Sequence, residues 1–332
     1  MKIVLATPLY PPQVGGPATY AKALHDAFVG EGHQVRVVRY GLLERTLPVG
    51  LRHGVYFLRL LPATVGADAA LAFDTWSVGL PALAATQLLK KKLVVRIGGD
   101  FLWESYVGRT KEPVRLSDFY TTSRAFSSKE KMVYAGTRKL VGSNCTLAFN
   151  TSWQRDIWQK AYGFDASRAM VVENFFPSER RAMPAKGKVF VSAGREHPLK
   201  NQKLLETVFA KVKEDYPDIS LDTRSLPPDE HRARLRDAYA VIVASLSEVN
   251  PNTLIDAIGA GKPFIGPTDS GANDALRAAG QLIDTSDPHA LETAIRTLLD
   301  PLQYDTWTKR SRECTFSRAW ADVASDFLTL LS

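Results

Sequence analysis

The chain has 332 residues, of which 45% are apolar and 23% are charged. This composition is typical of a globular protein and excludes an intrinsically disordered one, and the length is enough for two domains of roughly 150 residues each. No apolar run approaches the length of a membrane-spanning helix, which needs about 18 residues.

The cysteines and the N-terminus predict a cytoplasmic protein. Cys145 and Cys314 are far apart in the sequence, which indicates core thiols in a reducing compartment rather than a disulfide framework. Residues 1–9 contain too short an apolar run for a signal peptide and lead directly into a proline turn, so we expect a first strand there.

The formal charge of +7 arises in one part of the chain. Residues 86–139 hold twelve Lys and Arg but five Asp and Glu, so this segment accounts for the whole excess. Such a segment would attract an anionic sugar nucleotide, an anionic lipid surface or a nucleic acid, and it is equally compatible with a solvated protein face.

The N-terminal segment predicts a β-α-β unit with a glycine-rich turn. A strand is expected over residues 2–7 and a helix over 18–30, where apolar residues recur at helical spacing. Between them lie Gly15 and Gly16, which permit a sharp turn or the close approach of a ligand. A second strand is expected over 34–39.

Alternating helix and strand patterns continue to residue 97, as a doubly wound parallel sheet requires. Asp100 follows the last of these strands. Because ligands bind at the carboxyl ends of parallel strands, Asp100 is a candidate ligand contact; an ordinary turn aspartate is the other interpretation.

The middle of the chain is less regular. Residues 106–132 are basic and aromatic, and we expect loops and helices there that could meet sugar rings, lipid phosphates or an anionic membrane surface, between which the sequence does not choose. A short strand is expected over 140–143 and a helix over 153–162. Asn174 precedes a linker over 177–184.

A second domain is predicted from residue 186. Its first strand, over 188–193, is followed by Arg195 and Lys200. Two cations beyond a strand end would lie beside a bound diphosphate and stabilise the charge of a leaving nucleotide without a divalent metal. The chain contains no Asp-x-Asp sequence, and we predict no metal site.

A strand, a polar turn and a helix are predicted over residues 241–261. Asn250 is expected to cap the helix, with Pro251 at its first position. The helix dipole and the free amides at its start would then bind a phosphate. These amides belong to Asn252, Thr253 and Leu254.

Two carboxylates flank this anion site. Glu248 stands just ahead of the helix and Asp256 about one turn inside it. One could accept hydrogen bonds from sugar hydroxyls and the other from the paired hydroxyls of a ribose. The alternative is that both are solvated surface charges.

These motifs resemble those of family 4 glycosyltransferases, retaining enzymes of the GT-B fold. The Glu248-to-Asp256 segment with its following Gly-Lys-Pro resembles the family's Glu-x7-Glu segment, and Arg195 and Lys200 have the family's Arg-x4-Lys spacing. Two positions depart from the pattern, because Asp256 replaces a glutamate and Ile97 stands where many relatives have histidine. The resemblance covers nearly the whole chain.

The resemblance implies an α/β protein with two Rossmann-like doubly wound domains facing a central cleft. The N-terminal acceptor-side domain would span residues 1–180 and the donor-binding domain 186–317. The remaining segment, 318–332, would form a helix that crosses back to the first domain.

The implied activity is metal-independent, retaining transfer of a hexose-type sugar from a UDP- or GDP-sugar to a hydroxyl group of a glycan or lipid-linked glycan, without a cofactor. Contact with the inner face of an anionic membrane would be peripheral. The implied catalytic residues are Asp100, Arg195, Lys200 and Glu248; the implied donor-binding residues are Gly15, Gly16, Asn174, Asn252, Thr253, Leu254 and Asp256.

Three alternatives remain open from the sequence. The protein could be a non-catalytic sugar-nucleotide binder or partner subunit, since two family positions are substituted. It could be a GT-B-like epimerase, which would need a catalytic acid and base around the sugar. Nucleic-acid binding through the basic segment is the third, although no recognition module is visible.

Overall fold

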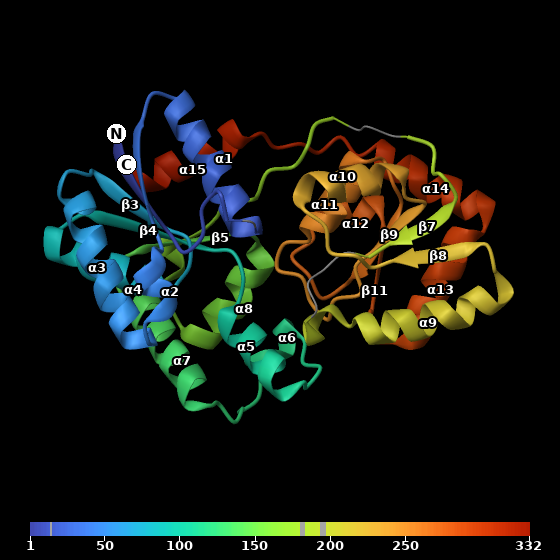
Figure 1. The fold of residues 1–332 in the computed structure, drawn as a ribbon, viewed down its shortest axis with the longest axis horizontal. Coiled ribbons are helices and arrows are strands. Elements are labelled where there is room, and N and C mark those ends of the chain that lie inside the picture. Colours follow the sequence, from blue (N-terminus) through green and yellow to red (C-terminus); the bar gives the residue numbers. More distant parts are fainter. Residues whose placement is uncertain (14, 180–182, 193–196) are drawn as a thin grey trace. The chain divides into compact units, whose positions relative to one another are not determined.

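The computed structural model describes residues 1–13, 15–179, 183–192 and 197–332, and the chain forms two compact units (Figure 1). Unit 1 consists of Met1–Leu102, Arg124–Phe175 and Ala319–Ser332. Unit 2 consists of Trp103–Ser123 and Phe176–Arg318.

Unit 1 contains a six-stranded sheet in the order β2-β1-β3-β4-β5-β6, and every strand pair is parallel. The strands are β1 (Lys2–Thr7), β2 (Gln34–Arg39), β3 (Ala69–Ala72), β4 (Lys92–Ile97), β5 (Thr146–Phe149) and β6 (Ala169–Val171). Strand β1 lies between β2 and β3, so the strand order reverses at β1, as in doubly wound sheets.

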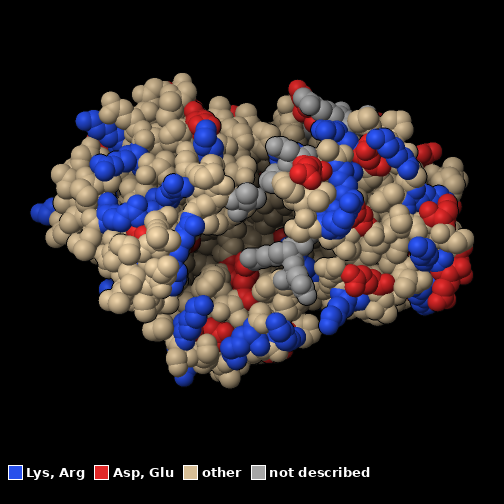
Figure 2. Space-filling model, in the orientation of Figure 1, with Lys and Arg blue, Asp and Glu red and all other residues tan. Residues whose placement is uncertain are grey.

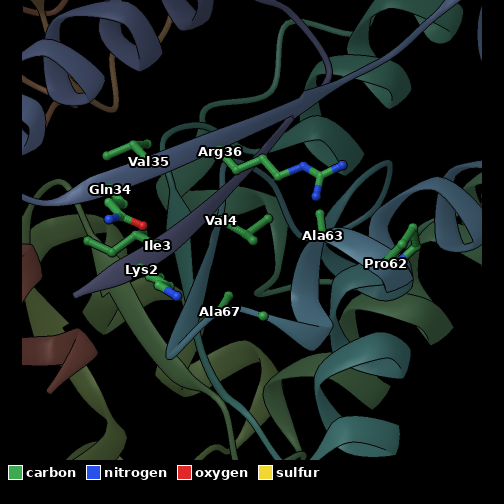
Figure 3. A pocket seen from close by; sticks show the side chains of 10 residues that line it. Lys2, Ile3, Val4, Gln34, Val35, Arg36, Pro62, Ala63 and Ala67 are labelled. Atoms are coloured by element: carbon green, nitrogen blue, oxygen red, sulfur yellow. The ribbon is translucent and has the colours of Figure 1, made fainter.

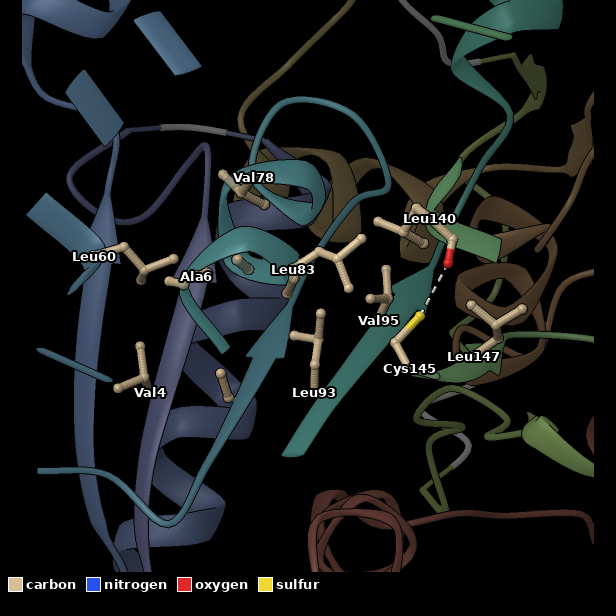
Figure 4. Close-up of a cluster of buried hydrophobic side chains, with 14 of the residues drawn as sticks. Val4, Ala6, Leu60, Val78, Leu83, Leu93, Val95, Leu140, Cys145 and Leu147 are labelled. Carbon is tan, nitrogen blue, oxygen red and sulfur yellow. Dashed lines mark hydrogen bonds between the residues drawn. The ribbon is translucent and has the colours of Figure 1, made fainter. Parts of the chain in front are cut away.

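Helices cover both faces of this sheet. Along β1, Val4 and Ala6 enter one apolar core, whereas Ile3 and Leu5 enter the other, because successive side chains of a strand point to opposite faces. Figure 4 shows the first core, where Leu60, Leu83 and Leu140 of three helices meet β1, β4 and β5. The helices are α1 (Gly16–Gly30), α2 (Leu42–Thr46), α3 (Val49–Val65), α4 (Gly79–Leu89), α7 (Ser128–Val141), α8 (Ser152–Tyr162), η1 (Ala166–Arg168) and α15 (Trp320–Leu331).

The second core of unit 1 is closed by α15, the last helix of the chain. Its Phe327 is fully buried in the same apolar cluster as Leu24 and Phe28 of α1. At the start of α15, the Trp320 ring lies edge-on to Tyr20, with 4.9 Å between the ring centroids, and stacks on Phe175 at 5.5 Å. Aromatic pairs at such distances stabilise packing beyond the area they bury.

The strand predicted over residues 140–143 is wrong, because Leu140 and Val141 form the last turn of α7. That helix starts with a reciprocal cap, in which the Ser127 Oγ accepts from the Glu130 amide and the Glu130 carboxylate accepts from the Ser127 amide. A short apolar run at the end of an amphipathic helix has the same local pattern as a buried strand. The actual strand, β5, follows a few residues later.

Unit 2 contains a five-stranded parallel sheet in the order β11-β10-β9-β7-β8. Its strands are β7 (Lys188–Val191), β8 (Ile219–Asp222), β9 (Ala240–Ile242), β10 (Phe264–Pro267) and β11 (Gln281–Ile283). Its helices are α6 (Leu116–Phe119), η2 (Pro198–Lys200), α9 (Gln202–Asp215), α10 (Pro228–Asp237), α11 (Asn252–Gly259), α12 (Asp274–Ala279), α13 (Pro288–Leu299) and α14 (Pro301–Arg312), while α5 (Phe101–Thr110) begins in unit 1 and continues in unit 2. The strand order reverses between β7 and β9. Two doubly wound parallel sheets confirm the predicted fold class.

The segment after α5 belongs to unit 2 by specific polar contacts. The Arg115 guanidinium pairs with the Asp284 carboxylate, and the Leu116 amide donates a 2.8 Å hydrogen bond to the Ser247 Oγ. The division expected from the sequence kept residues 103–123 in the first domain. The contacts that attach this segment to the second unit join residues more than 100 positions apart in the sequence. Local sequence patterns cannot predict such contacts.

We expect Gly79→Ala to destabilise unit 1. A Cβ atom at Gly79 would lie 2.3 Å from the Asp74 carbonyl oxygen and 2.9 Å from a Leu140 methyl group. The backbone atom cannot move aside, so the cost should be about 1–3 kcal/mol. In thermal unfolding, the matched Gly54→Ala variant in α3, where no atom lies within 4 Å, should instead unfold at a slightly higher temperature. Equal melting temperatures for the two variants would contradict this packing.

Candidate functional site

Lys200 and Glu248 meet at the switch point of the unit 2 sheet. Lys200 follows β7 and Glu248 follows β9, and the strand order reverses between these strands. The Lys200 Nζ lies 2.6 Å from the Glu248 Oε1, although the residues are 48 positions apart. The Ser245 hydroxyl donates to the same carboxylate oxygen, also at 2.6 Å. Switch points of this kind are where open parallel sheets bind ligands.

Backbone hydrogen bonds fix the position of this cluster. The Leu246 amide donates to the Leu199 carbonyl at 2.8 Å, which connects the loop after β9 to η2. The Glu248 amide donates to the Asp269 carbonyl at 3.2 Å, and the Gly271 amide donates to the Glu248 carbonyl at 2.9 Å. Three loops, after β7, β9 and β10, are therefore held together around a half-buried ion pair.

The start of α11 differs from the prediction. The helix begins at Asn252, and Pro251 is the residue before it, with φ −78° and ψ 67°. The Asn250 side chain therefore does not cap the helix; its amide donates to the Asn252 side chain instead. The Pro251 carbonyl accepts from the Leu254 amide at 2.9 Å and the Ile255 amide at 3.1 Å, so the helix starts one residue later than expected.

Two of the three amides predicted to bind phosphate are already used. The Asn252 amide donates to the Asn250 carbonyl at 2.8 Å, and the Leu254 amide donates to Pro251. The Thr253 amide alone of the three has no hydrogen-bond partner among the described residues. An anion at this helix would therefore meet one free amide together with the helix dipole.

Asp256 is a half-buried acid in α11. Burial in apolar surroundings raises the pKa of its carboxyl to about 6, and the Arg232 charge opposes this shift. Within the part of the chain that the structure describes, no donor hydrogen-bonds to the carboxylate. A carboxylate kept partly desolvated without an internal partner is a candidate ligand-binding group.

Arg195, the other predicted cation, lies outside the described residues. The structure therefore places one member of the predicted cation pair, Lys200, and brings it to Glu248.

In unit 1 the predicted glycines start helix α1 after β1. Gly15 has φ +150°, a conformation that L-residues rarely adopt, and its carbonyl accepts from the Ala18 and Thr19 amides at 3.0 and 3.1 Å. A side chain at Gly15 would therefore be strained. Gly16 is the first residue of α1, and a Cβ atom there would meet open space.

Asp100 is buried in unit 1. Its Oδ2 accepts a 2.8 Å hydrogen bond from the Trp158 indole nitrogen. This contact connects the end of β4 to α8 and gives Asp100 a structural role. Its contact with a substrate stays a prediction.

Asn174 lies beside a cation that sequence reasoning missed. Its side-chain oxygen accepts from the Arg96 Nη2 at 3.3 Å. Arg96 is buried, its guanidinium carbon lies 3.7 Å from the centroid of the Tyr20 ring, and its Nε has no hydrogen-bond partner among the described residues. An arginine between the apolar residues Val95 and Ile97 of strand β4 was the signal that could have found it.

Two more buried polar side chains are incompletely bonded near Gly98. The Asn150 amide donates to the Gly98 carbonyl at 3.5 Å, and the Gln154 amide donates to the Gly99 carbonyl at 2.9 Å. The side-chain oxygens of both residues have no partner in the described structure. Buried polar atoms without partners are rare in native proteins, so the carboxyl edge of β4 and β5 has unused capacity for water or ligand.

A separate cavity of about 300 Å³ lies at the opposite, amino end of the unit 1 sheet (Figure 3). Lys2, Gln34 and Arg36 of the first two strands line it together with Pro62 and Ala63 of α3. None of the predicted site residues contributes to it.

Basic side chains do not gather in one patch on the face shown in Figure 2, where they are scattered over both units and interleaved with acidic ones on unit 2. Among the described residues, no group of three or more His, Cys, Asp or Glu is arranged to hold a metal ion. The described helices also include none that is both long and apolar enough to span a bilayer.

No family model and no curated protein matches this sequence. The structure, however, resembles solved glycosyltransferases along its whole length. Sucrose-phosphate synthase from Thermosynechococcus elongatus matches with a TM-score of 0.71 at 13% identity, over 99% of this chain and 98% of that one. WaaG, a glycosyltransferase of lipopolysaccharide biosynthesis, matches with 0.70 at 13% identity over 99% of both chains.

HepE of Anabaena, solved with UDP and glucose, matches with a TM-score of 0.67 at 13% identity over 99% of this chain and 98% of that one. The protein therefore has the GT-B fold of these glycosyltransferases. A putative UDP-N-acetylglucosamine 2-epimerase from Listeria monocytogenes also matches, with 0.60 at 14% identity over 98% of this chain and 94% of that one. The fold is thus shared by two kinds of enzyme named for sugar chemistry.

We expect Asp256→Asn to raise stability at neutral pH. An aspartate in an unfolded chain has a pKa of about 3.9, against about 6 in the folded protein. Between these values the folded state binds more protons, so stability falls as pH rises from about 4 to about 6 and stays lower above that. The substitution should recover up to about 3 kcal/mol at pH 7.

Urea unfolding between pH 4 and 8 would measure this effect. The control is Asp305→Asn, which changes an exposed aspartate of α14. If Asp256→Asn and Asp305→Asn show the same pH dependence as the parent, the Asp256 carboxylate is not desolvated.

Proposed function

We propose that the protein is a retaining, metal-independent glycosyltransferase that moves a hexose-type sugar from a UDP- or GDP-sugar to a hydroxyl group of a glycan or lipid-linked glycan. The observation that carries the proposal is the Lys200–Glu248–Ser245 cluster at the β7/β9 switch point of unit 2. It combines a cation for phosphate with a carboxylate for sugar hydroxyls at the edge where a parallel sheet binds nucleotides.

The GT-B fold supports this assignment. HepE, which matches over nearly all of both chains, was solved with UDP and glucose, the two parts of a nucleotide-sugar. WaaG acts in lipopolysaccharide biosynthesis, which supports a glycan or glycolipid acceptor. The resemblance in the sequence motifs implies donor contacts for Lys200 and Glu248, and the contact between these two side chains at the switch point supports the proposal.

In the proposed mechanism, unit 2 holds the donor. Lys200 and Arg195 would neutralise the diphosphate, and the Thr253 amide at the start of α11 would add one hydrogen bond. The Lys200 ammonium pairs with the Glu248 carboxylate, and a donor phosphate would compete for the ammonium and free the carboxylate for sugar hydroxyls. Asp256 would accept from the ribose hydroxyls, through a water if its side chain, shorter than glutamate by roughly 1.5 Å, does not reach.

Retention of the anomeric configuration follows the family's route. The acceptor hydroxyl would attack from the face that the nucleotide leaves, and an oxygen of the donor phosphate would take its proton. The bond from the sugar to the nucleotide breaks as the bond to the acceptor oxygen forms. Lys200 and Arg195 would stabilise the charge that accumulates on the departing diphosphate, as a divalent metal does in other enzymes.

The acceptor side would lie on unit 1, with Asp100 at the carboxyl edge of its sheet, where Gly15, Gly16 and Asn174 would contribute to donor binding. Arg96, buried beside Asn174 with an unpartnered Nε, adds a cation there. We further propose that the protein acts in the cytoplasm with peripheral contact to an anionic membrane surface, where lipid-linked acceptors would be found.

Epimerisation of a nucleotide-sugar is the second candidate function, because the Listeria protein with the same fold is named for it. An epimerase would change the stereochemistry of the sugar without an acceptor product. A thermal-shift screen with UDP-, GDP- and ADP-sugars would identify the nucleotide. Product analysis with and without glycan acceptors would then separate transfer, epimerisation and binding without turnover.

We expect Lys200→Gln to weaken nucleotide-sugar binding about tenfold or more, because it removes a charge-assisted hydrogen bond to the diphosphate. The matched control is Lys203→Gln, which removes an exposed lysine three residues further along, in α9. Titration calorimetry would compare both variants with the parent. Binding by Lys200→Gln that is as tight as that of the parent would refute the assignment of Lys200 to the diphosphate.

We expect Glu248→Gln to bind the free nucleotide nearly as well as the parent but to release nucleotide from the sugar donor at least about 100-fold more slowly. The reason is that its carboxylate contacts the sugar rather than the nucleotide. Release of UDP or GDP in the presence of acceptor would be measured for both proteins. A variant that turns over at the parental rate would remove Glu248 from the catalytic site.

A further inference from the structure

Helix α3 exposes apolar side chains on the face opposite to its core-facing side. Tyr56 and Leu60 are fully buried. Leu51, Leu58 and Val65 are 63%, 66% and 59% exposed. These three are spaced seven residues apart, which is close to two helical turns, so they form one stripe on the outer face. A surface helix normally carries polar residues there.

The neighbouring helix α2, which packs against α3, also exposes apolar side chains. Leu42 is 78% exposed and Leu43 is 59% exposed. We call the surface formed by Leu42, Leu43, Leu51, Leu58 and Val65 the α2–α3 surface. Single exposed leucines are ordinary, but several large apolar side chains on adjoining helices indicate an interaction site.

The chain segment that forms the α2–α3 surface is rich in arginine and poor in acids. Residues 34–65 contain five arginines and one acid, Glu44. Glu44 is buried and its carboxylate pairs with the Arg59 guanidinium, so it contributes no exposed negative charge. Arg36 projects from β2 toward α3, and Figure 3 shows its guanidinium group next to Ala63. Three of these arginines, Arg36, Arg45 and Arg52, are left to face a partner, because Arg59 is paired with Glu44 and Arg39 lies on the other face of β2, where it donates to the Pro11 carbonyl at 3.3 Å.

This charge pattern favours one of two possible partners for the α2–α3 surface, a second copy of the chain or a lipid bilayer. A second copy of the chain, joined by a two-fold axis, would bring the same arginines against each other without acids to pair them. An anionic bilayer offers both complements at once, apolar acyl chains for the leucines and phosphates for the guanidinium groups.

We propose that the α2–α3 surface docks unit 1 onto an anionic lipid bilayer, with α3 lying in the plane of the interface. The leucines and Val65 enter the boundary between headgroups and acyl chains, and the arginines contact lipid phosphates. The inference deepens the proposed function, on which it rests for the lipid-linked acceptor. It also places the membrane contact on α2 and α3 rather than on the basic segment 106–132.

Vesicle co-sedimentation of the full chain, without nucleotide or acceptor, tests the proposal independently of catalysis. Vesicles of phosphatidylcholine alone would be compared with vesicles that contain an equal part of phosphatidylglycerol. The test variant is Leu51→Gln, Leu58→Gln, Val65→Gln. The matched control is Leu88→Gln, Met132→Gln, Leu302→Gln, which changes three exposed apolar residues on other helices. Circular dichroism melting would confirm that both fold like the parent.

The parent should bind the anionic vesicles and bind phosphatidylcholine weakly. The α3 variant should lose about 100-fold or more in partitioning, because each leucine contributes about tenfold, while the control should keep the parental affinity. Arg36→Gln and Arg45→Gln should each cost about fivefold on anionic vesicles only.

Three results would overturn the proposal. The parent could fail to bind anionic vesicles, or the α3 variant could bind as tightly as the parent. Size-exclusion chromatography with light scattering could also show a dimer that the α3 substitutions dissociate, which would assign the surface to a second copy. Nucleotide-sugar binding, measured in the same preparations, should be unchanged by the α3 substitutions, so a failure of docking and a failure of the proposed function remain distinguishable.

Discussion

The parallel direction of the strands in each sheet is the constraint on which the rest of the molecule depends. When all strands run the same way, every segment that follows a strand emerges at the same edge of the sheet. In unit 2 this places Lys200, after β7, beside Glu248, after β9, at the one position where the connections diverge. The strand that precedes each polar residue is therefore enough to predict at which edge of the sheet that residue lies.

This arrangement has an energetic cost that is concentrated at the site. Asp256 is held in apolar surroundings that raise its pKa, and the Arg96 guanidinium is buried with an unpartnered Nε. A core selected for stability alone would replace both groups by apolar residues or pair them with opposite charges. Their retention at the carboxyl edges of the two sheets is the pattern expected of sites that trade stability for binding.

The sequence was sufficient for the fold class and for part of the site. Buried parallel strands are apolar runs separated by helical periods, and the acids and cations that follow them are visible as single residues. The Lys200–Glu248 pair was therefore predictable. The start of α11 was not, because Pro251 can stand either before or inside a first helical turn, and the choice decides which amides are free. The prediction of a strand over 140–143 was wrong, because an apolar pair at the end of a helix has the same local pattern as part of a buried strand.

Helix α3 shows a different limit of sequence reasoning. Apolar residues occur on both of its faces, so the helical period identifies a helix but not which face turns to the core. Only the packed structure shows that Tyr56 and Leu60 are inside and that Leu51 and Leu58 are outside. Arg96 is a similar case, because a charge inside an apolar strand is noticeable, but its partner Asn174 is 78 residues away.

The position of α15 determines how the chain must be made. The last helix supplies Val323, Phe327 and Leu331 to a core whose other members come mostly from the first 75 residues. In an N-terminal fragment that ends at Phe175, α1 would still pack on that side of the sheet, but the apolar surface that α15 covers would be exposed. During synthesis, the second core of unit 1 can therefore close only after α15 has emerged from the ribosome, whereas all segments of unit 2 are available as soon as Arg318 has emerged. The second unit is in effect an insertion that can finish folding inside a first unit still missing its final helix.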